Sequence, residues 1–160
     1  MKKLTLMTVF VVAAGINHTT WGQESAQPST EFSQHDQLRI AVQEICPVSG
    51  EKLGSMGSPV KVAIGEAQEE VFLCCAGCAK GKIDPQHWAA IHANIAKAQG
   101  KCPIMKKNLP ATGAKWTVAQ GEIIYVCCPP CIKKINANPE AAVAQVDAYY
   151  TAYLQTQNRR

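Results

Sequence analysis

The sequence predicts a small α+β protein made of two tandem modules, each with a Cys-Pro turn, a β-hairpin and a C-terminal helix. Three observations support this prediction. The 160 residues include eight cysteines in two sets of four, and each set opens with Cys-Pro followed by an aliphatic residue. Each set closes with an apolar run of β type that ends in Cys-Cys-x-x-Cys. A helical pattern that opens with Asp-Pro or Asn-Pro follows each set.

The two cysteine sets match in spacing. The first set comprises Cys46, Cys74, Cys75 and Cys78, and the second comprises Cys102, Cys127, Cys128 and Cys131. The opening cysteines lie 102 − 46 = 56 residues apart and the closing ones 131 − 78 = 53, so the second copy is shorter by 56 − 53 = 3 residues. No cysteine is left over. A duplicated module with four thiols indicates a binding site for a soft metal ion.

Residues 1–22 have the pattern of a secretory signal peptide. Lys2 and Lys3 form a basic start, and residues 4–16 form an apolar run that is too short to cross a bilayer as a helix. We expect cleavage after Gly22; an uncleaved amphipathic or membrane anchor is the alternative. Cys46 lies far beyond the apolar run, which argues against a lipid anchor. The mature protein is expected to be soluble, without a membrane span, and periplasmic or secreted.

Charge and composition narrow the classes of function. The chain has 16 basic and 12 acidic side chains, and loss of residues 1–22 would leave 14 and 12, a net charge of +2. This near-neutral balance, without a Lys/Arg-rich run, argues against nucleic acid as a partner. We expect the partners to be metal ions and a metal-handling protein. No Ser-His-Asp set or Gly-rich phosphate loop stands out, so no enzymatic activity is expected.

The first module is expected to span residues 37–99. Residues 23–36 are polar and predict a disordered leader. Apolar residues then recur at near-helical spacing over 37–45, which predicts a short helix before the first cysteine. Residues 60–64 alternate in polarity, and residues 70–74 return as an apolar run after a Gly-containing turn, which predicts a hairpin. A helix that begins at Asp84-Pro85 should follow, with Asp84 as its cap.

The second module, residues 100–160, repeats this order. Residues 116–118 and 123–126 predict a hairpin, and Asn138 precedes a longer helix with a partly aromatic face. Gly100 is a plausible C-cap for the preceding helix, and so short a connection predicts that the modules pack together. Four aromatic residues are expected in the core: Phe72, Trp88, Trp116 and Tyr125.

The closing Cys-x-x-Cys of each set lies where a strand meets a helix. This i, i+3 spacing places both sulfurs on one side of the first helical turn, where free amide groups and the helix dipole lower thiol pKa values. Three or four thiolates can close a tetrahedron around zinc or offer a low-coordinate pocket to copper(I). We therefore expect zinc or copper(I), about one ion per module, with all eight cysteines as candidate ligands.

Three alternatives to a metal-carrying role remain open for the cysteines. In a small exported domain, an even number of cysteines often indicates disulfides. The repeated spacing favours metal, because it is closer to zinc-ribbon and treble-clef ligand spacing. The Cys-x-x-Cys pairs also permit a thiol–disulfide oxidoreductase, although two short hairpin modules leave no room for the larger α/β sheet that such a site needs. A third reading is a structural module stapled by metal or disulfides.

Residues 44–98 and 100–150 each resemble a YHS or TRASH domain. The resemblance rests on four features: the Cys-Pro start, the hairpin, the (Phe/Tyr)-x-Cys-Cys-x-x-Cys end and the helix that opens with Asp/Asn-Pro. YHS and TRASH domains are small treble-clef-like modules associated with heavy-metal trafficking, resistance and sensing. The resemblance implies two tandem treble-clef-like modules. It also implies six principal ligands: Cys46, Cys74, Cys78, Cys102, Cys127 and Cys131. Cys75 and Cys128 lie at positions that vary in the family and are additional thiols.

Two methionines and two histidines are further candidate ligands. Met105 lies three residues after Cys102, but methionine often fills gaps in a core, so we favour a packing role for Met105 and for Met56. The i, i+5 spacing of His87 and His92 does not place both on one helix face. We interpret them as surface or boundary histidines.

Overall fold

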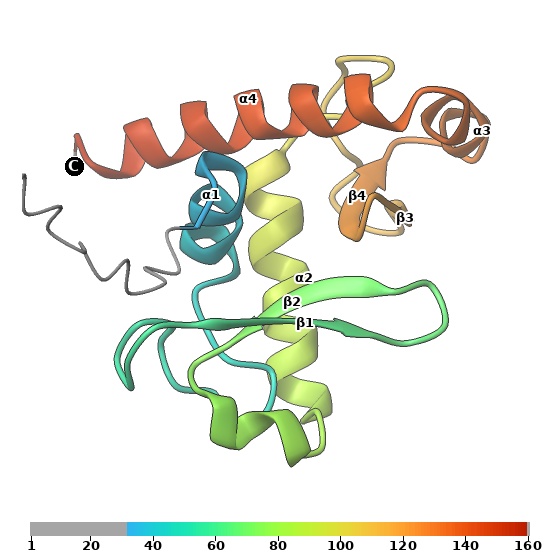
Figure 1. Cartoon of the computed structure of the whole chain (residues 1–160). Coiled ribbons are helices and arrows are strands. Elements are labelled where there is room, and N and C mark those ends of the chain that lie inside the picture. Colours follow the sequence, from blue (N-terminus) through green and yellow to red (C-terminus); the bar gives the residue numbers. More distant parts are fainter. Residues whose placement is uncertain (1–31, 160) are drawn as a thin grey trace, which may run out of the picture.

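The structure is a computed structural model that describes residues 32–159. The predicted signal peptide and residues 23–31 of the predicted leader lie outside these residues. The described chain is small and α+β, with four α-helices, one short 3₁₀ helix and two antiparallel hairpins (Figure 1). In order, the elements are α1 (Gln34–Gln43), β1 (Val60–Ile64), β2 (Glu69–Leu73), η1 (Ala76–Lys80), α2 (Pro85–Gln99), β3 (Lys115–Ala119), β4 (Glu122–Val126), α3 (Pro130–Ala137) and α4 (Pro139–Gln157).

Helix α1 begins earlier than the sequence pattern predicts. Its N-cap is Ser33, whose side chain accepts a hydrogen bond from the backbone amide of Asp36. Residues 34–36, assigned above to a disordered leader, are therefore helical. The helix ends at Gln43, and Glu44 follows with a positive φ of 66°. The apolar pattern that suggested 37–45 coincides with the buried residues of the helix only at Val42, because the others are Asp36, Arg39 and Gln43.

Both predicted hairpins are present, and each strand has five residues. β1 pairs with β2 from Val60–Leu73 to Ile64–Glu69, and β3 pairs with β4 in the same antiparallel manner. The first hairpin closes with four residues, 65–68, and the second with the two residues Gln120 and Gly121, both at positive φ. Two consecutive positive φ values give the turn whose twist best matches a hairpin. The turn therefore accounts for two of the three residues by which the second copy is shorter.

The three longer helices pack against one another. Asp84 caps α2 by accepting hydrogen bonds from the amides of Gln86 and His87, and Gly100 ends it in the left-handed region, as the sequence predicts. α4 lies across α1 and α2, while α3 forms a short separate helix beside β3 (Figure 1). A turn at Asn138 separates α3 from α4, and its side chain caps α4. No helix in residues 32–159 has the length and apolar character needed to span a bilayer.

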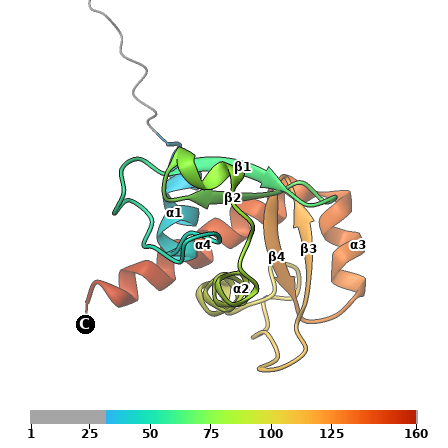
Figure 2. The ribbon, with the colours of Figure 1, turned by 90° about the horizontal axis from the view of Figure 1, so that it is seen from below.

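The two hairpins meet at the turn of the second one (Figure 2). The amide of Glu70 donates to the carbonyl of Gly121 at 2.7 Å, and Arg39 of α1 donates to the backbone carbonyls of both residues. A Cβ atom on Gly121 would lie 2.5 Å from Cγ of Glu70, so only glycine permits this approach. The two cysteine-containing parts of the chain are therefore packed together, as the short connection predicted.

The core is divided into two unequal clusters. The larger one lies between α1, α2, α4 and β4 and includes Ile124, Val146 and Tyr150. The smaller one surrounds Phe72 beneath the first hairpin. Phe72 and Tyr125 are buried as expected, and Trp88 is half-buried. Trp116 is 41% exposed, so its assignment to the core is wrong: it lies on the outer strand of a two-stranded sheet, where His92 contacts one side of the ring.

Candidate metal centre

Each opening cysteine lies in a tight turn that is repeated at the second site. The amide of Gly50 donates to the carbonyl of Cys46 at 2.9 Å, and that of Lys106 donates to the carbonyl of Cys102 at 2.8 Å. Gly50 and Lys106 each follow their cysteine by four residues and have positive φ values of 73° and 55°. The Cys-Pro sequences therefore form corresponding turns, each of which holds its cysteine sulfur under the neighbouring hairpin.

A buried glutamine fastens each turn to the strand that leads to the paired cysteines. Oε1 of Gln43 accepts from the amide of Phe72 at 2.9 Å, and its Nε2 donates to the carbonyl of Phe72 at 2.6 Å. Gln99 makes the same pair of bonds with Tyr125, at 2.8 and 2.7 Å. Each Nε2 also donates to the carbonyl of the residue before the opening cysteine. Sequence reasoning missed both residues, although each lies three positions before its cysteine.

At the first site, three sulfur atoms converge. The Sγ atoms of Cys46, Cys74 and Cys78 all lie within 4.8 Å of one another, and those of Cys74 and Cys78 are 3.6 Å apart. Sulfurs on one tetrahedral zinc ion, with bonds of about 2.3 Å, lie about 3.8 Å apart. Cys46 and Cys74 are buried and Cys78 is half-buried. The group has the spacing of metal ligands and is open to solvent on the side of Cys78.

The second site repeats this geometry. The Sγ atoms of Cys102, Cys127 and Cys131 lie within 4.8 Å of one another, and those of Cys127 and Cys131 are 4.0 Å apart. Cys102 and Cys131 are buried, while Cys127 is half-buried. All eight cysteines of the chain are free thiols, and the disulfide alternative is not realised in this structure.

The additional cysteines lie beside the triads. Sγ of Cys128 is 3.4 Å from that of Cys131 and 3.8 Å from that of Cys127. Cys75 is half-buried at the N-cap of η1, where hydrogen bonds from the backbone amides of Cys78 and Gly77 lower the pKa of its thiol. Neither belongs to the group of mutually close sulfurs that includes the opening cysteine, although Cys127, Cys128 and Cys131 are themselves mutually close. The structure thus distinguishes a triad from one adjacent thiol at each site.

In each triad, the opening and the last cysteine have opposed pKa shifts. Burial raises the pKa of Cys46, but hydrogen bonds from the side chain and amide of Ser49 outweigh it and lower the pKa to about 6. Contact with Cys74 and burial raise the pKa of Cys78 to about 12. At the second site, backbone amides lower the pKa of Cys102 against the effect of burial, and burial raises that of Cys131. One thiolate forms readily at each site, and a bound cation would remove the repulsion that opposes the others.

The other candidate ligands lie outside the triads. Met56 is 63% exposed and Met105 is 44% exposed, so the packing role favoured for both is wrong; each lies in a loop that no element covers. His87 is half-buried and contacts Gly50, because a Cβ atom there would lie 2.5 Å from its Nε2. His92 is half-buried, and its Nδ1 lies 2.7 Å from the hydroxyl oxygen of Tyr125. The interpretation of both as boundary histidines is confirmed.

Comparison of the chain with models of protein families, with curated proteins and with solved structures finds no match. The chemistry of the two sites therefore follows from their geometry alone. Each is a cysteine-rich group that can hold one metal ion, with donors that favour soft or borderline metals. A third group of mutually close ligand atoms joins His35, Glu122 and Asp147. These residues come from three separate elements, and no sequence spacing connects them.

Proposed function

We propose that this chain is an exported, non-enzymatic protein that binds zinc or copper(I) at two cysteine sites and acts as a carrier, buffer or sensor of such metals. The convergence of two cysteine triads supports the proposal most directly. The sites belong in this view to two tandem treble-clef-like modules of the YHS/TRASH type. In that arrangement, the turn supplies one ligand and the junction of strand and helix supplies the others.

The nature of the donors supports a soft metal. Each triad consists of sulfur, with no carboxylate among its members. Zinc would require a fourth ligand, and Cys128 lies close enough to two members of its triad to supply one, whereas copper(I) is stable with fewer thiolates. Cys75 has the corresponding role at the first site. Because Cys78 lies in a segment without a buried residue, the first site is the better suited of the two to exchange metal with a partner protein.

Elemental analysis under anaerobic conditions tests this function. Protein isolated from its native compartment should contain zinc or copper, and alkylation of its thiols should be slow until a chelator is added. Sequencing of its N-terminus should show cleavage near Gly22. Eight cysteines locked in disulfides, without metal uptake after reduction, would contradict metal binding. Uptake at both sites with no exchange to a competing thiol ligand would favour a structural role over carriage.

Thiol–disulfide exchange is the second candidate, because the Sγ atoms of Cys128 and Cys131 lie only 3.4 Å apart at the start of α3. Such a site is built on a larger α/β sheet, whereas the described residues form only two separate two-stranded sheets. We therefore rank exchange below metal binding. Catalysis of insulin reduction by the metal-free protein, lost in Cys128→Ser, would reverse this ranking.

A further inference from the structure

The third group of ligand atoms lies away from both cysteine sites, between α1, β4 and α4. His35 comes from the first turn of α1, Glu122 is the first residue of β4, and Asp147 lies in the middle of α4. One ligand atom from each lies within 4.8 Å of the other two. The donors are one imidazole nitrogen and two carboxylate oxygens, so this group differs in chemistry from the two triads of sulfur.

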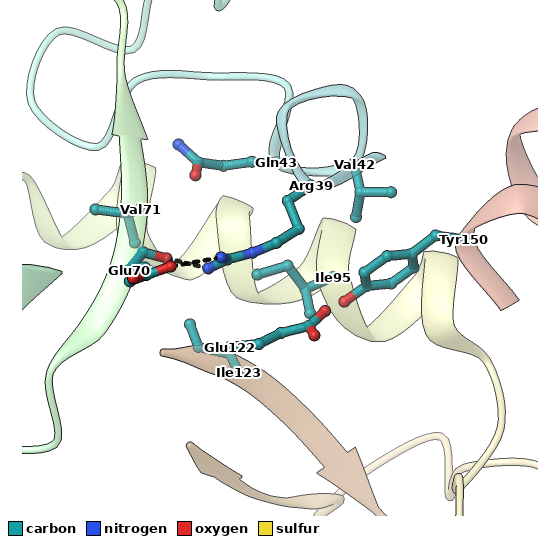
Figure 3. Close-up of a pocket in the computed structure, with 9 residues that line it drawn as sticks. All are labelled: Arg39, Val42, Gln43, Glu70, Val71, Ile95, Glu122, Ile123 and Tyr150. Carbon is teal, nitrogen blue, oxygen red and sulfur yellow. Dashed lines mark hydrogen bonds and ion pairs between the residues drawn. The ribbon is translucent and has the colours of Figure 1, made fainter. Parts of the chain in front are cut away.

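Glu122 is the residue that ordinary packing does not explain. It is only 1% exposed, and neither of its carboxylate oxygens has a hydrogen-bond partner among the described residues. Its carboxylate points toward the hydroxyl of Tyr150, with Arg39 on the other side (Figure 3). An unpartnered buried carboxylate is costly, and burial raises its pKa to about 8. Arg39 and the hydroxyl of Tyr150 offset only part of the effect of burial on Glu122, and a bound cation would offset more of it.

The other two residues form the open side of the group. Nδ1 of His35 donates to both carboxylate oxygens of Asp147 at 2.9 Å. To bind an ion through Nδ1, His35 would have to carry its proton on Nε2 instead; two ligands of one ion, with bonds of about 2.1 Å, lie about 3 to 3.4 Å apart. The side chains of His35 and Asp147 are 29% and 26% exposed, which leaves access from solvent. A cavity of about 20 Å³, enough for one water molecule, also lies beside Glu122, but Arg39, Glu70 and Tyr150 line it and His35 and Asp147 do not.

The surrounding charges are compatible with a cation. Arg39 is the positive group nearest the cavity, and its guanidinium donates to Oε2 of Glu70 at 2.9 Å and to the carbonyls of Glu70 and Gly121. Its charge is therefore matched by Glu70. In a metal-bound form the two carboxylates would supply a charge of −2, which a divalent ion would neutralise.

We propose that His35, Glu122 and Asp147 form a third metal site, free of thiolate, for a divalent first-row cation, with zinc as the reference ion. Nitrogen and carboxylate donors suit such ions and do not suit copper(I). An ion there would join α1, which precedes the first cysteine site, to β4 and α4, which belong to the second. The site does not depend on the function proposed for the cysteines.

Counting bound zinc in matched variants tests this site. Intact, reduced wild-type protein, Glu122→Gln and Asp147→Asn are dialysed against the same buffered free zinc and analysed for metal. We expect each variant to hold one zinc ion fewer than the wild type. Glu140→Gln, which removes an exposed carboxylate from the first turn of α4, should match the wild type. The comparison is a difference, so it remains valid if the cysteine sites bind no zinc.

Binding of cobalt(II) provides a second measurement. Cobalt bound by thiolates absorbs strongly in the near ultraviolet, and cobalt bound by nitrogen and oxygen does not. Glu122→Gln should lose one equivalent of bound cobalt without losing this absorbance. If circular dichroism shows that Glu122→Gln is unfolded, the more exposed Asp147→Asn supplies the result. Equal metal counts in the wild type and in the folded variants would overturn the proposal and identify Glu122 as a protonated core residue.

Discussion

The two cysteine sites share a ligand pattern but differ in what surrounds it. At the second site, Cys131 lies in α3, is 2% exposed and belongs to the larger core with Ile135 and Val146. At the first site, Cys78 lies in η1, a 3₁₀ helix without a buried residue, and is half-buried. The turn and the hairpin therefore set the positions of the sulfurs. The segment after the paired cysteines determines which member of the triad stays half-buried, Cys78 at the first site and Cys127 at the second.

The cause of this difference is visible in the closing segments. Residues 132 and 135 of α3 are isoleucines, which give the helix an apolar face against the core. The corresponding stretch, Ala76–Lys80, has only small or charged side chains around its cysteine and is followed by Gly81. Without an apolar face, it can neither extend into a full helix nor cover Cys78. The second site should therefore contribute more to stability, and the first should exchange metal more readily.

Removal of metal should have the largest effect of all. Each cysteine site is supported by about fifty residues, and domains of this size often need a metal or a disulfide for stability. Because metal bound only to the folded chain adds its binding free energy to folding, a strong chelator under reducing conditions should lower the melting temperature by about 10 °C or more, or abolish cooperative unfolding. Melts followed by circular dichroism test this. Superimposable melting curves would mean that bound metal does not stabilise the fold.

The buried glutamines should be next in importance. Gln99→Leu would leave the amide and carbonyl of Tyr125 buried without partners, and Gln43→Leu would do the same at Phe72. We expect each to reduce the free energy of unfolding of metal-free protein by about 2 to 4 kcal/mol, measured by urea denaturation. Gln86→Leu, on the exposed start of α2, is the matched control and should cost less than about 0.5 kcal/mol. Equal losses at all three positions would refute a positioning role.

Replacing one closing cysteine at a time tests the comparison directly. In metal-free, reduced protein, Cys131→Ser places a hydroxyl in the core and should cost about 1 to 3 kcal/mol, whereas Cys78→Ser, in the open segment, should cost less than about 1 kcal/mol. Urea denaturation measures both. If Cys78→Ser were as damaging as Cys131→Ser, burial would not be what distinguishes the sites.

Local features of the fold were predictable from the sequence, and long-range ones were not. The caps at Asp84 and Gly100, both hairpins and the cysteine turns follow from residues close together in the chain. The exposure of Trp116 depends on which elements cover β3, and local polarity does not report this. The group of His35 and Glu122 joins residues 87 positions apart, 122 − 35, so only the packing of α1 against the second hairpin reveals it.

The buried glutamines are an intermediate case. Gln43 and Gln99 are separated by 99 − 43 = 56 residues, the same offset as the opening cysteines, so the signal was present in the sequence. This signal was missed because a glutamine side chain at the end of an amphipathic helix is ordinarily expected to be exposed on the protein surface. Both are buried because each satisfies backbone groups that the edge of a two-stranded hairpin leaves free.

The smallest expected effect concerns Ser49, which occupies the position that Met105 has at the second site, 49 + 56 = 105. The hydrogen bonds of Ser49 help lower the pKa of Cys46 to about 6, although burial opposes them, while Cys102 has backbone donors and the thiol of Cys127 but no hydroxyl for this purpose. Ser49→Ala should therefore raise the pKa of Cys46 by about 1 in metal-free protein, and Met105→Ser should lower that of Cys102. Ultraviolet absorbance of the thiolates during a pH titration measures both changes.

The sign of the accompanying stability change follows from the same shift. The folded pKa of Cys46, about 6, lies below the ordinary value of 9.0, so ionisation of this thiol stabilises the folded state above the unfolded pKa, and this stabilisation is lost as the pH falls through about 6. In Ser49→Ala the loss should occur at higher pH. If the titrations of Ser49→Ala and the wild type coincided, the backbone turn alone would activate Cys46, and the two cysteine sites would differ only in burial.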